Sequence, residues 1–362
     1  MLRARRSLLL AALATPAARS VAQTAHDEPA YAKVTPRPLV FPRDHGAHPE
    51  YRIEWWYLTG WLDAQPQPLG FQITFFRSRT PIDPANPSRF AAHQLLIAHA
   101  ALADPARGGL LHDQRIARAG FSVTADERDT DVRLDGWRFR READGRYTAT
   151  IAAASFELAF DAEPTQPLLL QGDRGFSRKG PRAEQSSHYY SQPQLAVRAR
   201  LTREGRSATL SGRAWLDHEW SSTVLDANAA GWDWIGMNLD DGTALTAFQI
   251  RRKTDAHALY AYAALRAPGA TTVQVFAPDA VRFASLATWR SPRTGATYPV
   301  AQRIDIGARR FETQPLFADQ ELDTRATSGT VYWEGASRLR ESGKPVGRGY
   351  LELTGYVAPL TL

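Results

Sequence analysis

A dense aromatic and polar segment of the chain reads Ser211-Gly212-Arg213-Ala214-Trp215-Leu216-Asp217-His218-Glu219-Trp220-Ser221-Ser222. It holds two tryptophans, a histidine and two carboxylates, which is more polar chemistry than an ordinary strand carries. In an extended chain the side chains alternate between two faces. One face then carries Ala214, Leu216, His218 and Trp220, and the other carries Arg213, Trp215, Asp217 and Glu219.

His218 falls on the apolar face, and two interpretations stay open for it. A histidine among apolar neighbours is most often a hydrogen-bonded core residue. Alternatively it lines a pocket as a proton donor or ligand contact, since its unperturbed pKa of about 6.5 is easily tuned. Asp217 and Glu219 point the other way, and we expect them to bind neighbouring backbone or an arginine.

Length and composition indicate a globular protein with a sizeable core. With 362 residues, of which 43% are hydrophobic, the chain can form one large domain or two of ordinary size. It contains no cysteine, which excludes cysteine nucleophiles, thiolate metal sites and disulfides. Packing alone must therefore hold the fold together.

The N-terminus has the pattern of an export signal. A basic start that includes Arg5-Arg6 precedes an apolar run at 8–14, and Ser20-Val21-Ala22 supplies the small residues of a cleavage site. We expect residues 1–22 to be a signal peptide and the protein to be periplasmic or secreted. Arg5-Arg6 is typical of twin-arginine signals, although the general secretory route requires only the same charge and hydrophobicity. A membrane anchor is the alternative, but the apolar run is far shorter than the ~20 residues of a spanning helix, so the mature chain is predicted to have no integral membrane segment.

Cleavage would also remove most of the net positive charge. Four arginines lie in the signal, and without them 40 basic residues face 38 acidic ones, so the net charge falls from +6 to +2. No Lys/Arg run with interleaved aromatics remains. The composition therefore excludes a nucleic-acid partner.

After a Pro- and His-rich arm at 23–49, the chain is almost entirely strand-like. Gly, Pro, Asp and Asn separate short alternating or β-branched runs, and long 3.6-residue periodicity is hard to find. The predicted strands are 52–62, 69–77, 94–102, 131–140, 147–153, 155–160 and 195–202. This spacing favours a β-sandwich or barrel preceded by an extended arm that has no core of its own.

A self-comparison indicates that one hairpin recurs in the second half. The first copy begins at Trp56 and reaches Phe71-Gln72-Ile73, and the second begins at Trp234 and reaches Phe248-Gln249-Ile250. A common hairpin pattern could produce this match by coincidence. Otherwise the chain is two similar β-domains in tandem, at 50–225 and 226–362.

The familiar catalytic signatures are missing from the chain: it has no Gly-x-Ser-x-Gly elbow, no His-Glu-x-x-His and no phosphate-binding glycine loop. His45 and His48 have a metal-like spacing, but they lie in the arm beside Pro49, and we predict no metal there. The run Ser186-Ser187-His188-Tyr189-Tyr190-Ser191 either lines a pocket mouth or forms a solvated loop.

The segment Glu54-Trp55-Trp56-Tyr57 places a large aromatic on each of its faces. Any single tryptophan is most simply explained as core filling. The ten tryptophans together suggest a cavity with flat apolar walls, as a long hydrophobic ligand would need. If Glu54 faces such a cavity, desolvation would raise its pKa and let it act as a proton donor.

In combination, these motifs resemble the family that contains the carotenoid 1,2-hydratases (hydroxyneurosporene synthases) and the secreted AttH-like proteins. The resemblance covers the chain from about Tyr51 to the C-terminus. It is carried by Glu54-Trp55-Trp56-Tyr57-Leu58-Thr59-Gly60, His188-Tyr189-Tyr190-Ser191, residues 212–220 and Gly231-Trp232-Asp233-Trp234. It implies a tandem of two lipocalin-like barrels, in agreement with the internal repeat.

The resemblance also implies cofactor-free addition of water to a terminal C=C bond of an acyclic carotenoid. Such a reaction needs an acid to protonate the alkene, aromatic faces to stabilise the carbocation and a placed water. The His-x-Trp pair of these hydratases matches His218 and Trp220. Where a tyrosine and an aspartate would supply the acid, this chain reads Ala244-Leu245-Thr246-Ala247-Phe248-Gln249, so ligand binding without turnover stays an alternative.

The sequence therefore predicts an all-β, exported protein of two tandem lipocalin-like β-barrels that binds a small hydrophobic ligand, with hydratase chemistry as its candidate activity. His218, Trp220 and Glu54 are the expected catalytic residues. The expected ligand-binding residues are Trp55, Trp56, Tyr57, Tyr189, Tyr190, Trp232, Trp234 and Gln249. No cofactor is expected. A non-catalytic periplasmic interaction protein, for example one associated with an ABC transporter, is the alternative.

Overall fold

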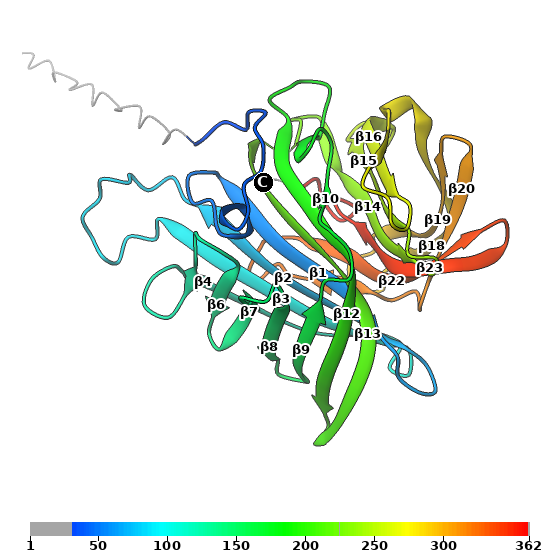
Figure 1. The fold of residues 1–362 in the computed structure, drawn as a ribbon, viewed down its shortest axis with the longest axis horizontal. Coiled ribbons are helices and arrows are strands. Elements are labelled where there is room, and N and C mark those ends of the chain that lie inside the picture. The colour runs from blue at the N-terminus through cyan, green and yellow to red at the C-terminus, as the bar shows by residue number, and fades with distance from the viewer. Residues whose placement is uncertain (1–30, 224, 361–362) are drawn as a thin grey trace, which may run out of the picture.

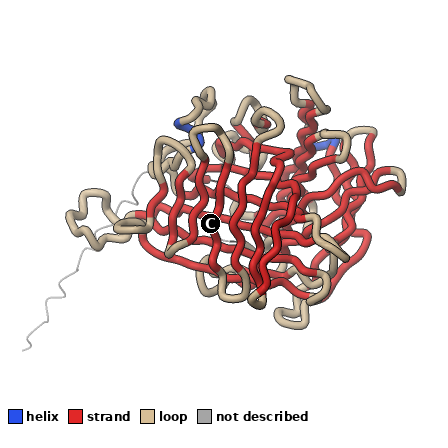
Figure 2. Tube along the Cα trace, turned by 60° about the horizontal axis from the view of Figure 1, so that its bottom comes forward, coloured by secondary structure: helices blue, strands red, loops and turns tan. Residues whose placement is uncertain are grey.

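The computed structural model describes residues 31–223 and 225–360, so the predicted signal peptide at 1–22 lies outside the described residues. The described chain is built from β-strands in two curled antiparallel sheets that lie side by side (Figure 1). Figure 2 shows how little helix there is: two 3-10 turns, η1 (Arg43–His45) and η2 (Pro278–Ala280). The predicted all-β class and the tandem of barrels are thus confirmed.

The first sheet runs in the order β4-β3-β2-β1-β13-β12-β9-β8-β7-β6-β5, with β10 and β11 also paired to β12. Its strands are β1 (Ile53–Leu62), β2 (Leu69–Arg79), β3 (Gln94–Asp104), β4 (Gly109–Arg118), β5 (Thr124–Ala125), β6 (Asp131–Leu134), β7 (Trp137–Arg141), β8 (Tyr147–Ala152), β9 (Glu157–Glu163), β10 (Leu169–Leu170), β11 (Phe176–Arg178), β12 (Ser186–Arg203) and β13 (Arg206–Thr223).

The second sheet runs in the order β17-β16-β15-β14-β23-β22-β20-β19-β18, with β21 also paired to β22. Its strands are β14 (Ala229–Leu239), β15 (Ala244–Arg252), β16 (Ala258–Arg266), β17 (Gln274–Phe276), β18 (Val281–Arg290), β19 (Thr297–Ile306), β20 (Arg309–Pro315), β21 (Glu321–Asp323), β22 (Val331–Glu341) and β23 (Lys344–Leu353). The chain passes from one sheet to the other between Thr223 and Ala229.

The two sheets repeat one topology, as the hairpin comparison predicted. In each, a three-strand meander (β1–β3, β14–β16) is bonded through its first strand to a later hairpin (β12–β13, β22–β23). The residue alignment was wrong, however: Trp56 packs in the first barrel's interior, whereas Trp234 packs between the barrels. Because side chains alternate along a strand, a shift of one residue in the alignment exchanges the two faces.

One further strand prediction was wrong. The run 131–140 is two strands, β6 and β7, that are joined at Asp135 and Gly136. Both residues have positive φ, 46° and 82°, as a two-residue Asp-Gly hairpin turn requires.

Three apolar cores follow from the alternation of side chains. One fills the first barrel and includes Trp56, Leu58 and Phe71, and a second fills the other barrel. The third lies between the barrels and draws Trp61 from the first sheet and Tyr350 from the second. We call this third region the junction. Its size makes the two barrels one packed body.

The N-terminal arm packs closely against the first barrel. Where extended chain without a core of its own was expected, the segment from Asp44 to His48 is fully buried. His48 stacks on Trp220 with ring centroids 3.7 Å apart. The arm thus contributes side chains to the interior of the first barrel.

Candidate functional site

Strand β13 supplies two buried polar clusters, one on each of its faces. His218 points into the first barrel, while Asp217 and Glu219 point into the junction, as the alternation predicted. All three side chains are buried. The segment 211–222 therefore serves two separate sites.

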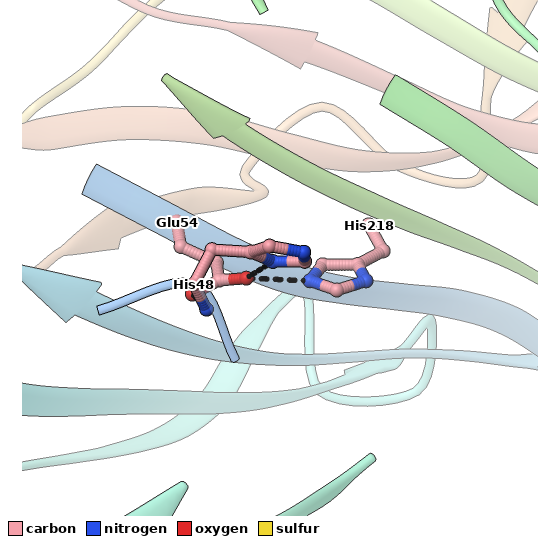
Figure 3. Close-up of side chains that lie close together, drawn as sticks. All are labelled: His48, Glu54 and His218. Atoms are coloured by element: carbon pink, nitrogen blue, oxygen red, sulfur yellow. Dashed lines mark hydrogen bonds and ion pairs between the residues drawn. The ribbon is translucent and has the colours of Figure 1, made fainter. Parts of the chain in front are cut away.

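Glu54, from β1, is the centre of the first cluster. Its Oε1 accepts hydrogen bonds from His48 Nδ1 at 2.7 Å and His218 Nε2 at 2.9 Å, and Arg77 Nε donates to Oε2 at 2.7 Å. Figure 3 shows His48, Glu54 and His218 converging from the arm, β1 and β13. The other two members are Asp44, which bonds His48 Nε2 at 3.0 Å, and Tyr190, whose hydroxyl lies 3.1 Å from His218 Nδ1. We call these six residues the barrel cluster.

The expectation that burial raises the pKa of Glu54 was wrong. Burial alone would raise its pKa, but the charges of His48 and Arg77 and the histidine hydrogen bonds hold the pKa of Glu54 well below its usual range. Burial lowers the pKa of His218 to about 4, against the influence of Glu54. For His48 the two neighbouring carboxylates outweigh burial and raise the pKa. The cluster is thus built around the ion pair of the Glu54 carboxylate with Arg77, and His48 lies between the carboxylates of Glu54 and Asp44.

Trp220 and Trp56 form apolar walls around this cluster. Trp56 stacks on His218 with centroids 4.6 Å apart and donates its indole N–H to the His45 carbonyl at 3.3 Å. Trp220 covers His48 and is fully buried. The run 186–191 belongs to buried strand β12, so the interpretation as a solvated loop was wrong.

The second cluster contains two glutamates that lie directly opposite each other on β22 and β23. Glu334 and Glu352 are cross-strand partners, and Trp234 on β14 is the partner of Glu352 on its other side. Side chains in such positions stand about 5 Å apart at Cβ. Tyr57 of the first barrel donates its hydroxyl proton to Glu334 Oε1, and Trp232 Nε1 donates to Glu352 Oε2 at 2.9 Å. The pair therefore lies at the junction.

Asp217 and Glu219 face this pair from the first barrel. We expected backbone or arginine partners, but Asp217 accepts hydrogen bonds from Tyr189 at 2.7 Å, Trp215 at 2.7 Å and Ser191 at 2.5 Å. Glu219 pairs with Lys179 at 3.0 Å. We call Tyr57, Lys179, Tyr189, Asp217, Glu219, Glu334 and Glu352 the junction cluster.

Burial and neighbouring negative charge raise the pKa values of three junction carboxyls, Glu334, Glu352 and Asp217. Burial and the charge of Glu352 raise the pKa of Glu334 well above its usual range, against the hydrogen bond from Tyr57. Burial, with the charges of Asp217 and Glu219, raises the pKa of Glu352 to about 7. Burial raises the pKa of Asp217 to about 7 as well, although its three donors oppose this. The junction thus brings together three carboxyls with raised pKa values, of which Glu352 and Asp217 titrate near pH 7.

Seven of the eight predicted ligand-binding residues lie at the two sites, and Gln249 lies at neither. Trp56 and Tyr190 lie inside the first barrel, and Gln249 donates to Asp233 at 2.7 Å in the second. The junction contains Trp55, Tyr57, Tyr189, Trp232 and Trp234. Trp55 and Trp232, with Glu352, keep part of their surface accessible.

The sequence analysis did not single out Asp44, Arg77, Glu334 or Glu352 as site residues. Glu352 had a recognisable signal, because it stands between Leu351 and Leu353 in an alternating strand whose other face is buried. Nothing in the sequence placed Glu334 opposite it.

A polar cleft of about 560 Å³ lies beside the barrel cluster. Its lining includes Arg141, Arg146, Glu163 and His45, and His45 Nδ1 lies 2.8 Å from the Tyr190 hydroxyl. The cleft contains none of the predicted ligand-binding aromatics. Its walls do not match an apolar ligand.

The fold and the two clusters define an all-β protein of two tandem barrels with buried titratable side chains at its centre. The AttH-like family profile matches residues 32–356, and the chain belongs to this family. It is 55% identical to an AttH-type protein from Nitrosomonas europaea of known crystal structure, with a TM-score of 0.84 over 90% of this chain and 99% of that one.

More distant structures share the fold. Kievitone hydratase from Nectria haematococca is 14% identical, with a TM-score of 0.67 over 91% of this chain and 97% of that one. CghA in complex with Sch210972 is 14% identical, with a TM-score of 0.56 over 85% and 89%. No functionally curated protein matches the chain. Within the described residues, no helix is long and apolar enough to cross a membrane.

Proposed function

We propose that this protein is an exported, cofactor-free acid–base catalyst that adds water to a C=C bond of an apolar, isoprenoid- or lipid-like substrate at the junction. The observation that carries the proposal is the Glu334–Glu352 pair, whose two carboxyls have pKa values raised to different extents among aromatic side chains. Two titratable groups whose environments separate their pKa values are typical of an acid and a base in one site. The name of the kievitone hydratase neighbour agrees with this reaction class but does not establish it.

Glu334 is suited to the role of the acid. Its Oε1 accepts the Tyr57 hydrogen bond, and its Oε2 is buried without a hydrogen-bond partner among the described residues. A proton held on Oε2 of Glu334 can therefore move to one carbon of the substrate's C=C bond. The C–H bond formed leaves a carbocation on the neighbouring carbon, which the faces of Trp232, Trp234 and Tyr57 would stabilise.

Glu352 is suited to the role of the base. Its Oε2 accepts a hydrogen bond from Trp232, and the residue is only half-buried, so water that enters the junction would meet it. With a pKa of about 7, it is partly ionised at neutral pH and can take a proton from the water that attacks the carbocation. The proton then passes from Glu352 to Glu334, which returns both carboxyls to their starting protonation states.

The test is turnover of acyclic polyenes, such as lycopene, by the mature protein in water labelled with heavy oxygen. Mass spectrometry detects the product, which gains one labelled water. Glu334→Gln and Glu352→Gln keep the side-chain shape, and each is expected to lower turnover by about 10²- to 10⁴-fold. The exposed Glu157→Gln is the matched control and should behave as wild type.

Two outcomes contradict the proposal. Polyene binding with no product from the wild type identifies a binding protein. Full turnover by Glu334→Gln, together with loss in a folded His218→Gln variant, assigns the chemistry to the barrel cluster.

A further inference from the structure

The barrel cluster supports a second inference that is independent of the proposed function. We propose that His48 Nδ1, Glu54 Oε1 and His218 Nε2 bind a divalent transition-metal ion, such as Zn²⁺, that fastens the N-terminal arm to the first barrel. These three atoms lie within 4.8 Å of one another, and all three residues are buried. Two imidazoles and a carboxylate are a ligand set that zinc uses in proteins.

The ligands come from three separate segments. His48 belongs to the arm, Glu54 to β1 and His218 to β13, and the two strands are direct neighbours in the sheet. In Figure 3 the three side chains point toward one common place. An ion bound there would join the arm to both strands.

The surrounding residues orient each ligand as in known metal sites. Each ligating histidine normally uses its other ring nitrogen in a hydrogen bond, and that bond fixes the ring. His48 bonds Asp44 through Nε2, at 3.0 Å, and His218 bonds Tyr190 through Nδ1, at 3.1 Å. Both histidines thus direct the remaining nitrogen at Glu54.

Glu54 is oriented in the same way. Arg77 Nε and the His48 backbone N–H bond Oε2, at 2.7 and 2.8 Å, which leaves Oε1 as the ligand atom. Zinc bonds of about 2.0–2.1 Å in tetrahedral geometry need ligand atoms about 3.4 Å apart. Oε1 now lies 2.7 and 2.9 Å from the two nitrogens, and all three atoms lie within 4.8 Å of one another. As the ion replaces the bridging protons, Oε1 must withdraw by roughly half an ångström and the two imidazoles must close on the ion.

The second barrel provides a matched control. Asp233 there accepts from Arg251 Nε at 2.9 Å, as Glu54 accepts from Arg77. The other side-chain partners of Asp233 are Gln249 and Tyr356, and among residues 31–223 and 225–360 no histidine bonds it. Asp233→Asn therefore changes a buried acid–arginine pair without removing a proposed ligand.

The experiment uses tag-free mature protein that has been treated with chelator, loaded with Zn²⁺ and passed through gel filtration. We expect one zinc ion per chain, a higher melting temperature and slower trypsin cleavage of the arm at Lys33 and Arg43. His48→Gln and His218→Gln should lose the bound zinc, and Asp44→Asn should weaken binding by about tenfold or more. Asp233→Asn and the exposed His257→Gln should bind as wild type.

Less than stoichiometric zinc on the wild type, or unchanged binding by His218→Gln, overturns the inference. If the histidine variants do not fold, X-ray absorption of the zinc-loaded wild type decides the question. Scattering from two imidazoles and a carboxylate supports the site, and a zinc environment without two imidazoles contradicts it.

Discussion

Replacing Glu54 by alanine, with chelator present, is expected to lower the free energy of unfolding by about 3–5 kcal/mol, because it leaves a buried cation without its partner. His48 can release its proton when the carboxylate is removed, but Arg77 cannot, and its guanidinium is 2% exposed. Urea unfolding followed by tryptophan fluorescence measures the change.

The control for this prediction is Asp305→Asn. Asp305 bonds Arg310 on the surface, where water screens the pair, so no resolvable change is expected. A loss of less than 1 kcal/mol in Glu54→Ala would mean that the barrel cluster is solvated, contrary to the burial described above.

Truncating Trp61 is expected to have an effect of similar size through packing. Trp61 is 1% exposed, and it reaches from the first barrel to donate its indole N–H to the Gly349 carbonyl of the second at 2.9 Å. Trp61→Ala should cost about 3–5 kcal/mol, since it opens a cavity at the junction and removes this hydrogen bond between the barrels. We also expect the single unfolding transition to separate into two, because the barrels lose a contact that couples them.

Calorimetry of Trp61→Ala, Trp61→Phe and the 71% exposed Phe90→Ala tests this packing. Trp61→Phe should recover most of the stability, and Phe90→Ala should melt as wild type. One unchanged transition in Trp61→Ala would show that the barrels do not depend on each other through this side chain.

The fold was largely predictable because it depends on local features: the alternation of apolar and polar residues along each strand, and the turn residues between strands. Period-two runs separated by turn residues gave the all-β class, and the recurring hairpin gave the two barrels. The alternation along 211–222 correctly placed His218 on one face of the strand and Asp217 and Glu219 on the other. The error at 131–140 was also local, since Asp135-Gly136 is itself a hairpin turn signal.

The sites were less predictable because their chemistry depends on partners remote in sequence. The pKa of Glu54 follows from Arg77 on the next strand and from His48 in an arm whose burial no local pattern indicates. Glu334 and Glu352 meet only through the register of β22 and β23. The resemblance to hydratases drew attention to His218 and Trp220. The carboxyls with raised pKa values lie instead at the junction, which the opposite face of β13 covers.

The raised pKa of Glu352 also fixes the sign of its effect on stability. Its pKa in the folded protein is about 7, and its unfolded value is near 4.3. Between these values the folded state holds a proton that the unfolded state has lost. The contribution of this proton to stability is therefore complete below about pH 4 and is lost as the pH rises through 7.

Infrared difference spectroscopy of the carboxyl C=O stretch tests most directly whether the junction pair holds a proton at neutral pH. At pH 7 the wild type should absorb as a protonated carboxylic acid, and part of this band should disappear in Glu334→Gln. A second part, from Glu352 and Asp217, should fade as the pH rises through about 7 and be reduced in Glu352→Gln. A wild-type spectrum at pH 7 with only ionised carboxylates in these positions would contradict the account.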